Sequence, residues 1–129
     1  MVKQSKEILV VDDDRDYANL IKLRLETSGY QVSWASNGME ALNLLETNYK
    51  PDLIIMDIEM PDRNGLTTII NLNVRHLREK NAVKIPIIVA TGLQSEAVRD
   101  LLTAQQISDY VTKPYDASLL IEKIHQLIE

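Results

Sequence analysis

Aspartates at the ends of two apolar runs are the residues of this sequence best suited to chemistry. Asp12, Asp13 and Asp14 follow the run ILVV, and Asp57 follows the run LIIM. Ionised carboxylates that lie close together raise one another's pKa unless a cation neutralises them. A hard divalent cation, most simply Mg2+ with retained waters, is the natural ligand for such a group. The pattern therefore predicts a magnesium site, provided that the fold brings the two runs together.

An acidic run at the start of a helix also has a simpler explanation. Acidic side chains cap helix N-termini and interact favourably with the helix dipole, and we assign this capping role to Asp14. Two further polar residues favour a functional role for the other aspartates. Thr91 follows an apolar run in IIVATG, and Lys113 follows a further, more polar predicted strand in YVTKP.

Carboxylates, a hydroxyl and an ammonium together form a set of groups that can hold a phosphoryl group beside a metal ion. Mg2+ and Lys113 would offset charge on the phosphoryl oxygens, Thr91 would donate a hydrogen bond, and a carboxylate would accept the phosphoryl group. We expect Asp57 to be the acceptor, because the apolar strand before it fixes its direction.

The elements that must position these groups alternate between strand and helix. Each short apolar run is followed by a stretch with helical periodicity, which gives five βα units. Parallel strands need crossover connections, so this alternation predicts an α/β fold: a doubly wound parallel sheet with helices on both faces. We expect strands at residues 8–11, 31–35, 53–56, 85–90 and 109–112.

The composition of the strands indicates their order in the sheet. The runs that begin at residues 8, 53 and 85 are continuously apolar, as strands covered on both faces should be, whereas the other two include polar residues. This favours the order 2-1-3-4-5 of a flavodoxin-like (βα)5 sandwich, although the pattern leaves other orders open. Ligands of such sheets bind beyond the carboxyl ends of the strands, where the winding reverses between strands one and three.

Periodicity and end signals predict the helices. The first runs from about Asp14 to Ser28 and stops at Gly29, Asn37 with Glu40 forms a capping-box start for the second, and Asp116 caps the last. A fourth, shorter helix is expected to open at Ser95. The apolar residues expected on these helices are Tyr17, Leu20, Ile21 and Leu25 on the first, facing inward; Leu66, Ile69, Ile70, Val74 and Leu77 on the third; Val98, Leu101 and Leu102 on the fourth; and Ala117, Leu120, Ile121, Ile124, Leu127 and Ile128 on the last.

Length and composition limit the class of protein. The chain has 129 residues, of which 45% are hydrophobic, so we expect one domain over residues 1–129. Its net charge of -5 argues against direct binding to nucleic acid. There is no cysteine, no signal-peptide pattern and no apolar run of the roughly 20 residues that cross a bilayer, so we expect a cytoplasmic protein that does not bind membranes.

The blocks ILVVDDD, DLIIMDIEMPDRNG, PIIVATG and YVTKPY, in this order and spacing, resemble the receiver domain of two-component response regulators. The resemblance covers nearly the whole chain, and in size the chain is similar to the single-domain chemotaxis type. It implies that Asp57 accepts a phosphoryl group from a phosphohistidine on a sensor histidine kinase or phosphotransfer protein. A downstream protein or a fused output domain would then read the phosphorylated state.

The resemblance also implies roles for individual residues. Mg2+ would be bound by Asp13, Asp57 and the backbone carbonyl of Glu59, with Asp12 acting mostly through metal-bound water. Lys113 would pair with the phosphoryl group, and its bond to Pro114 would be a cis peptide that aims the ammonium inward. The remaining implied roles are the switch pair Thr91 and Tyr110, backbone contacts from Glu59 and Gly92 to the phosphoryl group, and a permissive turn at Gly65.

Two other classes of protein are compatible with parts of this pattern. A small Mg2+-dependent aspartyl phosphohydrolase also uses an aspartate at a strand end, but it normally has a second aspartate where this chain has Glu59. A flavodoxin-like FMN carrier needs a phosphate-binding first loop, and the loop DDDRD would repel a phosphate. The receiver domain is therefore the preferred interpretation.

Overall fold

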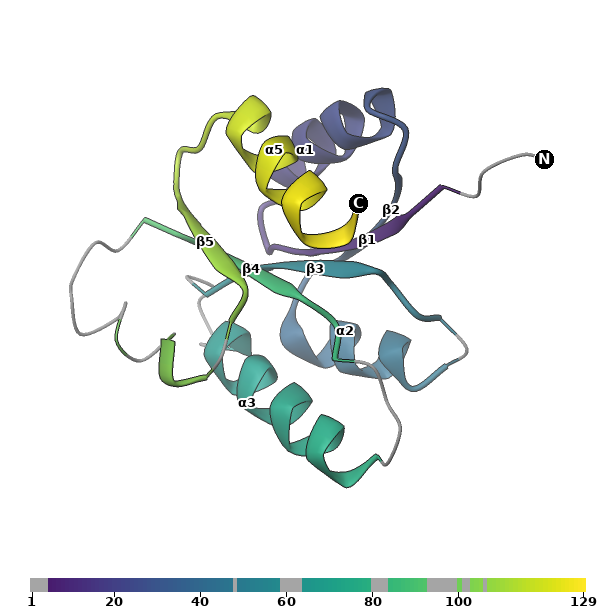
Figure 1. The fold of residues 1–129 in the computed structure, drawn as a ribbon, viewed down its shortest axis with the longest axis vertical. Helices are drawn as coiled ribbons and strands as arrows, with labels where there is room; N and C mark the ends of the chain where they lie inside the picture. Colours follow the sequence, from purple (N-terminus) through teal and green to yellow (C-terminus); the bar gives the residue numbers. More distant parts are fainter. Residues whose placement is uncertain are drawn as a thin grey trace.

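A five-stranded parallel sheet forms the centre of the protein, as Figure 1 shows. The computed structural model describes residues 5–47, 49–58, 64–79, 84–92, 100, 103–105 and 107–129. The strand order is β2-β1-β3-β4-β5, which confirms the predicted flavodoxin-like order. The strands are β1 (Glu7–Val11), β2 (Gln31–Ala35), β3 (Leu53–Asp57), β4 (Ile87–Thr91) and β5 (Asp109–Thr112).

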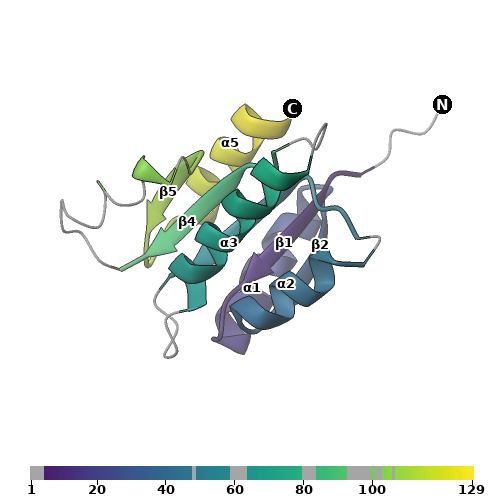
Figure 2. The same cartoon turned by 90° about the horizontal axis from the view of Figure 1, so that it is seen from below.

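Helices cover both faces of this sheet. Two of them, α1 and α5, lie together on one face, and α2 and α3 lie together on the other (Figures 1 and 2). Every residue of β3 and β4 is buried, as expected for central strands that are covered on both sides. The helix bounds are α1 (Arg15–Thr27), α2 (Gly38–Leu45), α3 (Asn64–Arg78) and α5 (Ala117–Ile128).

The predicted helix-end signals are found in the structure. The carboxylate of Asp14 accepts a hydrogen bond from the Tyr17 backbone N–H at 3.0 Å and caps α1. Gly29 has a φ of 98°, a left-handed conformation that glycine adopts without strain. It lets the Tyr30 N–H reach back to the carbonyl of Leu25 at 3.1 Å, which closes the helix.

The other two predicted caps are also present. At the start of α2, the Asn37 side chain accepts a hydrogen bond from the Glu40 backbone N–H at 2.9 Å. At the start of α5, the Asp116 side chain accepts one from the Ser118 N–H at 2.8 Å.

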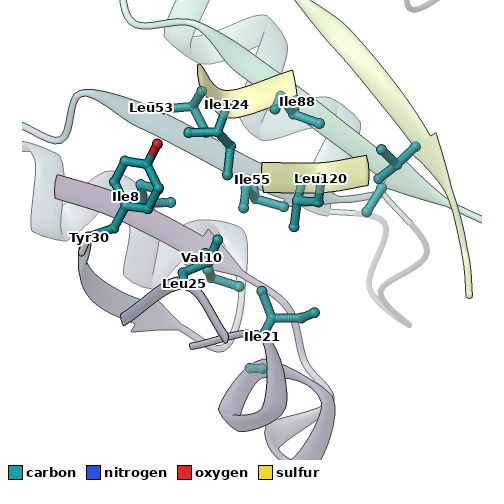
Figure 3. Packing of buried hydrophobic residues seen from close by; sticks show 13 residues of the cluster. Ile8, Val10, Ile21, Leu25, Tyr30, Leu53, Ile55, Ile88, Leu120 and Ile124 are labelled. Atoms are coloured by element: carbon teal, nitrogen blue, oxygen red, sulfur yellow. The ribbon is translucent and has the colours of Figure 1, made fainter. Parts of the chain in front are cut away.

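Alternating residues of each strand enter two separate apolar clusters. Ile8 and Val10 of β1 face α1 and α5, whereas Leu9 and Val11 face α2 and α3. Figure 3 shows the first cluster, in which Leu120 and Ile124 of α5 lie over the sheet. The last helix therefore buries the stripe predicted for it.

Some apolar positions on the helices differ from prediction. Leu20 was expected to face inward but is 55% exposed, because Ala18, Ile21 and Leu25 form the buried side of α1. Only part of the predicted apolar stripe of α3 is buried: Ile69 is fully buried and Leu66 packs against the same cluster, but Ile70, Val74 and Leu77 are exposed. The predicted start of the fourth helix at Ser95, with Val98, Leu101 and Leu102, lies outside the described residues.

None of the helices within the described ranges combines the length and apolarity needed to span a bilayer.

Candidate phosphoacceptor site

The acidic residues and the lysine predicted for the site come together because of the alternation along the strands. Ile55 of β3 and Val111 of β5 enter the cluster under α1 and α5. Two residues further along each strand are Asp57 and Lys113, which continue the same side of the sheet. Val10 places Asp12 on this side in the same way. Three chain segments therefore direct their polar groups to one point beyond the carboxyl ends of β1, β3 and β5.

Lys113 joins the two buried aspartates. Its ammonium Nζ lies 2.8 Å from Oδ2 of Asp12 and 3.2 Å from Oδ2 of Asp57. The side chains of the two aspartates are only 5% and 4% exposed, and that of Lys113 is 20% exposed. Ion pairs shielded from water in this way are much less weakened by salt than pairs on the surface. The peptide bond between Lys113 and Pro114 is cis, as predicted.

The electrostatics of the site favour the binding of a cation. Burial raises the pKa of Asp12 above its ordinary value, and the negative charge of Asp57 adds to this, despite opposing contributions from Lys113 and the Asp14 N–H. Burial alone would lower the pKa of Lys113, but its bonds and attraction to Asp12 and Asp57 outweigh this effect and raise it. Lys113 therefore remains an ammonium, and the site still has more negative than positive groups.

Asp13 completes a group of three carboxylates. One oxygen each of Asp12, Asp13 and Asp57 lies within 4.8 Å of the others. Asp13 is exposed while the other two are buried, so the group opens to solvent on one side. An oxygen-only donor set with access to water fits Mg2+, which prefers carboxylates and keeps several of its waters. The residues present therefore fit the predicted ion, and Glu59, whose carbonyl was the further predicted ligand, lies outside the described residues.

Gly65 supports the site for a different reason from the one predicted. The sequence suggested a turn that needs permissive backbone angles, but Gly65 lies inside α3 and only Gly29 is recorded with a positive φ among the described glycines. A Cβ atom on Gly65 would lie 2.3 Å from the carbonyl oxygen of Asp57 and 2.6 Å from Cα of Ile58. Glycine is therefore needed so that α3 can pack directly against the backbone that carries Asp57.

The predicted switch residues lie on the opposite side of the sheet from Lys113. Val89 belongs to the cluster under α2 and α3, and Thr91 continues this side at the end of β4, where it is 2% exposed. Tyr110 pairs with Val89 in the β4–β5 register and packs against the same cluster. Thr91 and Tyr110 are thus near neighbours on one face. Gly92, the predicted backbone contact, follows Thr91 at an exposed position.

Comparison with known proteins gives a clear assignment. The family model described as "Response regulator receiver domain" matches residues 8–125. This chain belongs to the receiver domain family of response regulators.

Individual relatives support this assignment. The chain is 34% identical over 122 residues to the transcriptional regulatory protein CpxR of Escherichia coli K12, covering 95% of this chain and 49% of that protein. It is 38% identical over 111 residues to the alkaline phosphatase synthesis transcriptional regulatory protein PhoP of Bacillus subtilis, covering 86% and 43%. The solved receiver domain of the Francisella response regulator 1452 has a TM-score of 0.84 and 30% identity, with 96% and 97% covered. The chain thus spans about half the length of the curated relatives that it matches.

Membership in the family has two general consequences. Receiver domains are signalling domains rather than classical enzymes. Receiver domains also generally bind Mg2+ at a cluster of aspartates, and this receiver domain has such a cluster.

Aromatic residues around the site were not predicted to belong to it. The Trp34 indole N–H donates a hydrogen bond to the backbone carbonyl of Asp12 at 2.7 Å, which fixes the chain between β1 and α1. The Tyr17 ring lies against the ammonium of Lys113. Helical periodicity correctly predicted that Tyr17 faces inward, but it could not predict the contact with Lys113, which lies nearly a hundred residues later in the sequence.

Proposed function

We propose that this receiver domain is a phosphorylation-activated switch and that Asp57 accepts a phosphoryl group from a phosphohistidine of a sensor histidine kinase or phosphotransfer protein. The observation that carries the proposal is the placement of the Asp57 carboxylate, which is buried at the end of β3, 3.2 Å from an ammonium and beside two further carboxylates. An acceptor in this position has a fixed direction and a cation ready for the incoming charge.

The transfer requires little covalent chemistry from the protein. A carboxylate oxygen of Asp57 attacks the phosphorus atom, the bond from phosphorus to the histidine nitrogen breaks, and the imidazole leaves with that electron pair. Lys113 offsets the negative charge on the phosphoryl oxygens, and the hydroxyl of Thr91 donates a hydrogen bond to one of them. The backbone N–H groups of Glu59 and Gly92 complete the contacts in this proposal.

The proposal includes a Mg2+ ion bound at this site. Asp13 and Asp57 would bind it with the carbonyl of Glu59, and Asp12 would act mostly through its waters. When bound, Mg2+ neutralises charge on the carboxylates and on the phosphoryl oxygens. Asp12 and Asp13 serve to hold the ion, and the burial of Asp12 beside Lys113 keeps this pair in place before the ion arrives.

The signal would travel through Thr91 and Tyr110. Thr91 at the end of β4 turns its hydroxyl toward the phosphoryl group, and the ring of Tyr110 moves into the space that is vacated. Their shared side of the sheet and the pairing of Tyr110 with Val89 support such a relay, because the two side chains lie on the same face of adjacent strands. Phosphorylation would then shift a two-state equilibrium that a partner reads near β5 and α5.

The extent of the domain, its cellular location and its output also belong to this proposal. We propose that residues 1–129 form one receiver unit that acts in the cytoplasm. Its output would be a downstream protein or a fused output domain; CpxR and PhoP, which are about twice as long, are both described as transcriptional regulatory proteins.

Mass spectrometry tests the acceptor directly. Incubation with Mg2+ and a small phosphodonor such as acetyl phosphate is expected to add one phosphoryl group to the protein, and Asp57→Asn is expected to abolish the addition. Asp52→Asn is the matched control, because Asp52 is a partly buried aspartate that accepts a hydrogen bond from the Glu7 N–H at the opposite end of β3. Labelling of Asp57→Asn at the wild-type rate would refute the proposal.

The same experiment separates the switch from a small aspartyl phosphohydrolase. A switch takes up one phosphoryl group and releases it slowly. A phosphohydrolase would consume many equivalents of a phosphate ester per minute without accumulating the phosphorylated form.

A further inference from the structure

The ammonium of Lys113 has a third neighbour besides its two carboxylates. Its Nζ atom lies 4.6 Å from the centroid of the Tyr17 ring, within the range of a cation–π interaction. Tyr17 stands in the first turn of α1, and its backbone N–H is held by the capping side chain of Asp14. The ring is therefore presented to the site by a fixed helix end.

A second aromatic ring holds Tyr17 in this orientation. Tyr115, two residues after Lys113, meets Tyr17 edge to face, with 5.5 Å between the ring centroids and 81° between the planes. Both rings pack against the apolar cluster under α1 and α5. Burial, with a smaller contribution from Tyr17, raises the pKa of the Tyr115 hydroxyl, which keeps the Tyr115 ring neutral over the physiological range.

The hydroxyl of Tyr17 has only a weak polar neighbour in this arrangement. It is buried and no hydrogen bond of good geometry reaches it among the described residues, although it lies close enough to the Tyr115 hydroxyl to help raise the pKa of that group. A buried hydroxyl without a well-formed hydrogen bond costs free energy, so the hydroxyl adds little that would favour a tyrosine at this position. The ring face, not the hydroxyl, is what makes the contact with Lys113.

The contact with the ring differs in kind from the two ion pairs. Both carboxylate partners of Lys113 belong to the group expected to bind the metal ion, and one of them is the proposed phosphoacceptor. An ion would offset the charge of these carboxylates and phosphorylation would consume the charge of Asp57, whereas neither event alters the ring face of Tyr17. Tyr17 thus gives the flexible lysine side chain one restraint that is independent of the state of the site.

We propose that Tyr17 is a positioning residue that keeps the ammonium of Lys113 directed at the phosphoacceptor, with Tyr115 holding the ring in place. This inference rests on the proposed function for its consequence, because the positioned ammonium is the group that would meet the phosphoryl oxygens. The cation–π contact between the ammonium and the ring is itself independent of phosphorylation.

Two substitutions separate the ring from the hydroxyl. Tyr17→Phe keeps the ring face and removes only the hydroxyl, so it is expected to keep most of the phosphorylation rate with a small phosphodonor and to be no less stable in urea. Tyr17→Leu keeps an apolar side chain but removes the ring face. It is expected to lower the rate about twofold to thirtyfold, the factor that corresponds to one cation–π contact.

A double-mutant cycle shows whether the loss acts through Lys113. In the background of Lys113→Met, Tyr17→Leu is expected to cause no further loss of rate. Tyr30→Leu is the control for damage to the core, since Tyr30 is a buried tyrosine of the same cluster but precedes β2, at the opposite end of the sheet. It is expected to lower stability while leaving the phosphorylation rate unchanged.

An NMR measurement gives a readout that does not depend on phosphorylation. The Cε protons of Lys113 should show an upfield ring-current shift in the wild type and in Tyr17→Phe, and this shift should disappear in Tyr17→Leu. A wild type that shows the shift but takes up no phosphoryl group would refute the proposed function and leave the seating of the ammonium intact. Absence of the shift in the wild type, or an equal loss of rate on adding Tyr17→Leu to Lys113→Met, would overturn the inference.

Discussion

Gly65 offers a sharp test of how the fold supports the site. In Gly65→Ala, the added Cβ would lie 2.3 Å from the Asp57 carbonyl oxygen and 2.6 Å from Cα of Ile58, both backbone atoms that cannot rotate away. Ordinary contacts begin at 3.4 Å, so the start of α3 and the end of β3 must separate by about 1 Å. The substitution therefore acts on the backbone of the proposed acceptor without changing any polar group.

The expected effect on stability is modest, because two contributions oppose each other. Overpacking costs about 1–3 kcal/mol, and the better helix propensity of alanine returns at most about 1 kcal/mol. The free energy of unfolding should thus fall by between zero and about 3 kcal/mol. The effect on phosphorylation should be larger, since a displacement of about 1 Å in a reacting group can lower a rate about a hundredfold.

Urea unfolding and the rate of phosphorylation by a small phosphodonor measure the two effects separately. Gly29→Ala is the matched control: no atom lies within 4 Å of its added Cβ, but its φ of 98° is strained for alanine. This control should lose about 1 kcal/mol of stability and keep its phosphorylation rate. A Gly65→Ala protein with wild-type stability and wild-type rate would refute the close-packing argument.

Two further predictions concern the carboxylates. Burial raises the pKa of Asp12 above 3.8, so the folded metal-free protein binds this proton more tightly than the unfolded chain does, and its stability falls as pH rises through the folded pKa. Asp12→Asn should therefore have a higher urea midpoint than the wild type at pH 7 in the presence of a chelator, and this advantage should vanish below pH 3.8; an advantage that persists in acid would contradict the argument. Addition of Mg2+ should change the emission of Trp34, the single tryptophan, because its indole is bonded to the backbone of Asp12. Asp13→Asn should weaken the Mg2+ affinity measured in this way, whereas Asp14→Asn, which replaces one good helix cap by another, should not; equal affinities in the two variants would exclude Asp13 as a ligand.

The sequence predicted those parts of the site that depend on strand ends. Asp12, Asp57 and Lys113 each stand at the end of a predicted strand, and parallel strands bring their carboxyl ends to one edge, so topology alone was enough to assemble them. The helix caps at Asp14, Asn37 and Asp116 were equally accessible, because capping is decided within four residues of the chain.

Features that depend on packing between distant segments were not predictable in the same way. Leu20 belongs to the helical pattern of α1, but whether an apolar residue at the margin of a stripe is covered depends on the neighbouring elements. The glycine at position 65 was predicted to be required, but for a turn rather than for packing. Its close approach to the Asp57 backbone depends on a second element, β3, which no local pattern shows. The contact of Tyr17 with Lys113 joins the first helix to the loop after the last strand, and no local pattern records it.

The alternation of side chains along the strands also divides the proposed mechanism between the two faces of the sheet. Asp12, Asp57 and Lys113 continue the side covered by α1 and α5, where Tyr17 also lies. Thr91 and Tyr110 continue the side covered by α2 and α3. Both sets approach the carboxyl edge of the sheet, so a phosphoryl group there can meet Lys113 from one side and Thr91 from the other, with Tyr110 behind Thr91. Substitutions that loosen Lys113 should therefore alter how fast the site is phosphorylated, and substitutions at Tyr110 should alter how the phosphorylated state is transmitted.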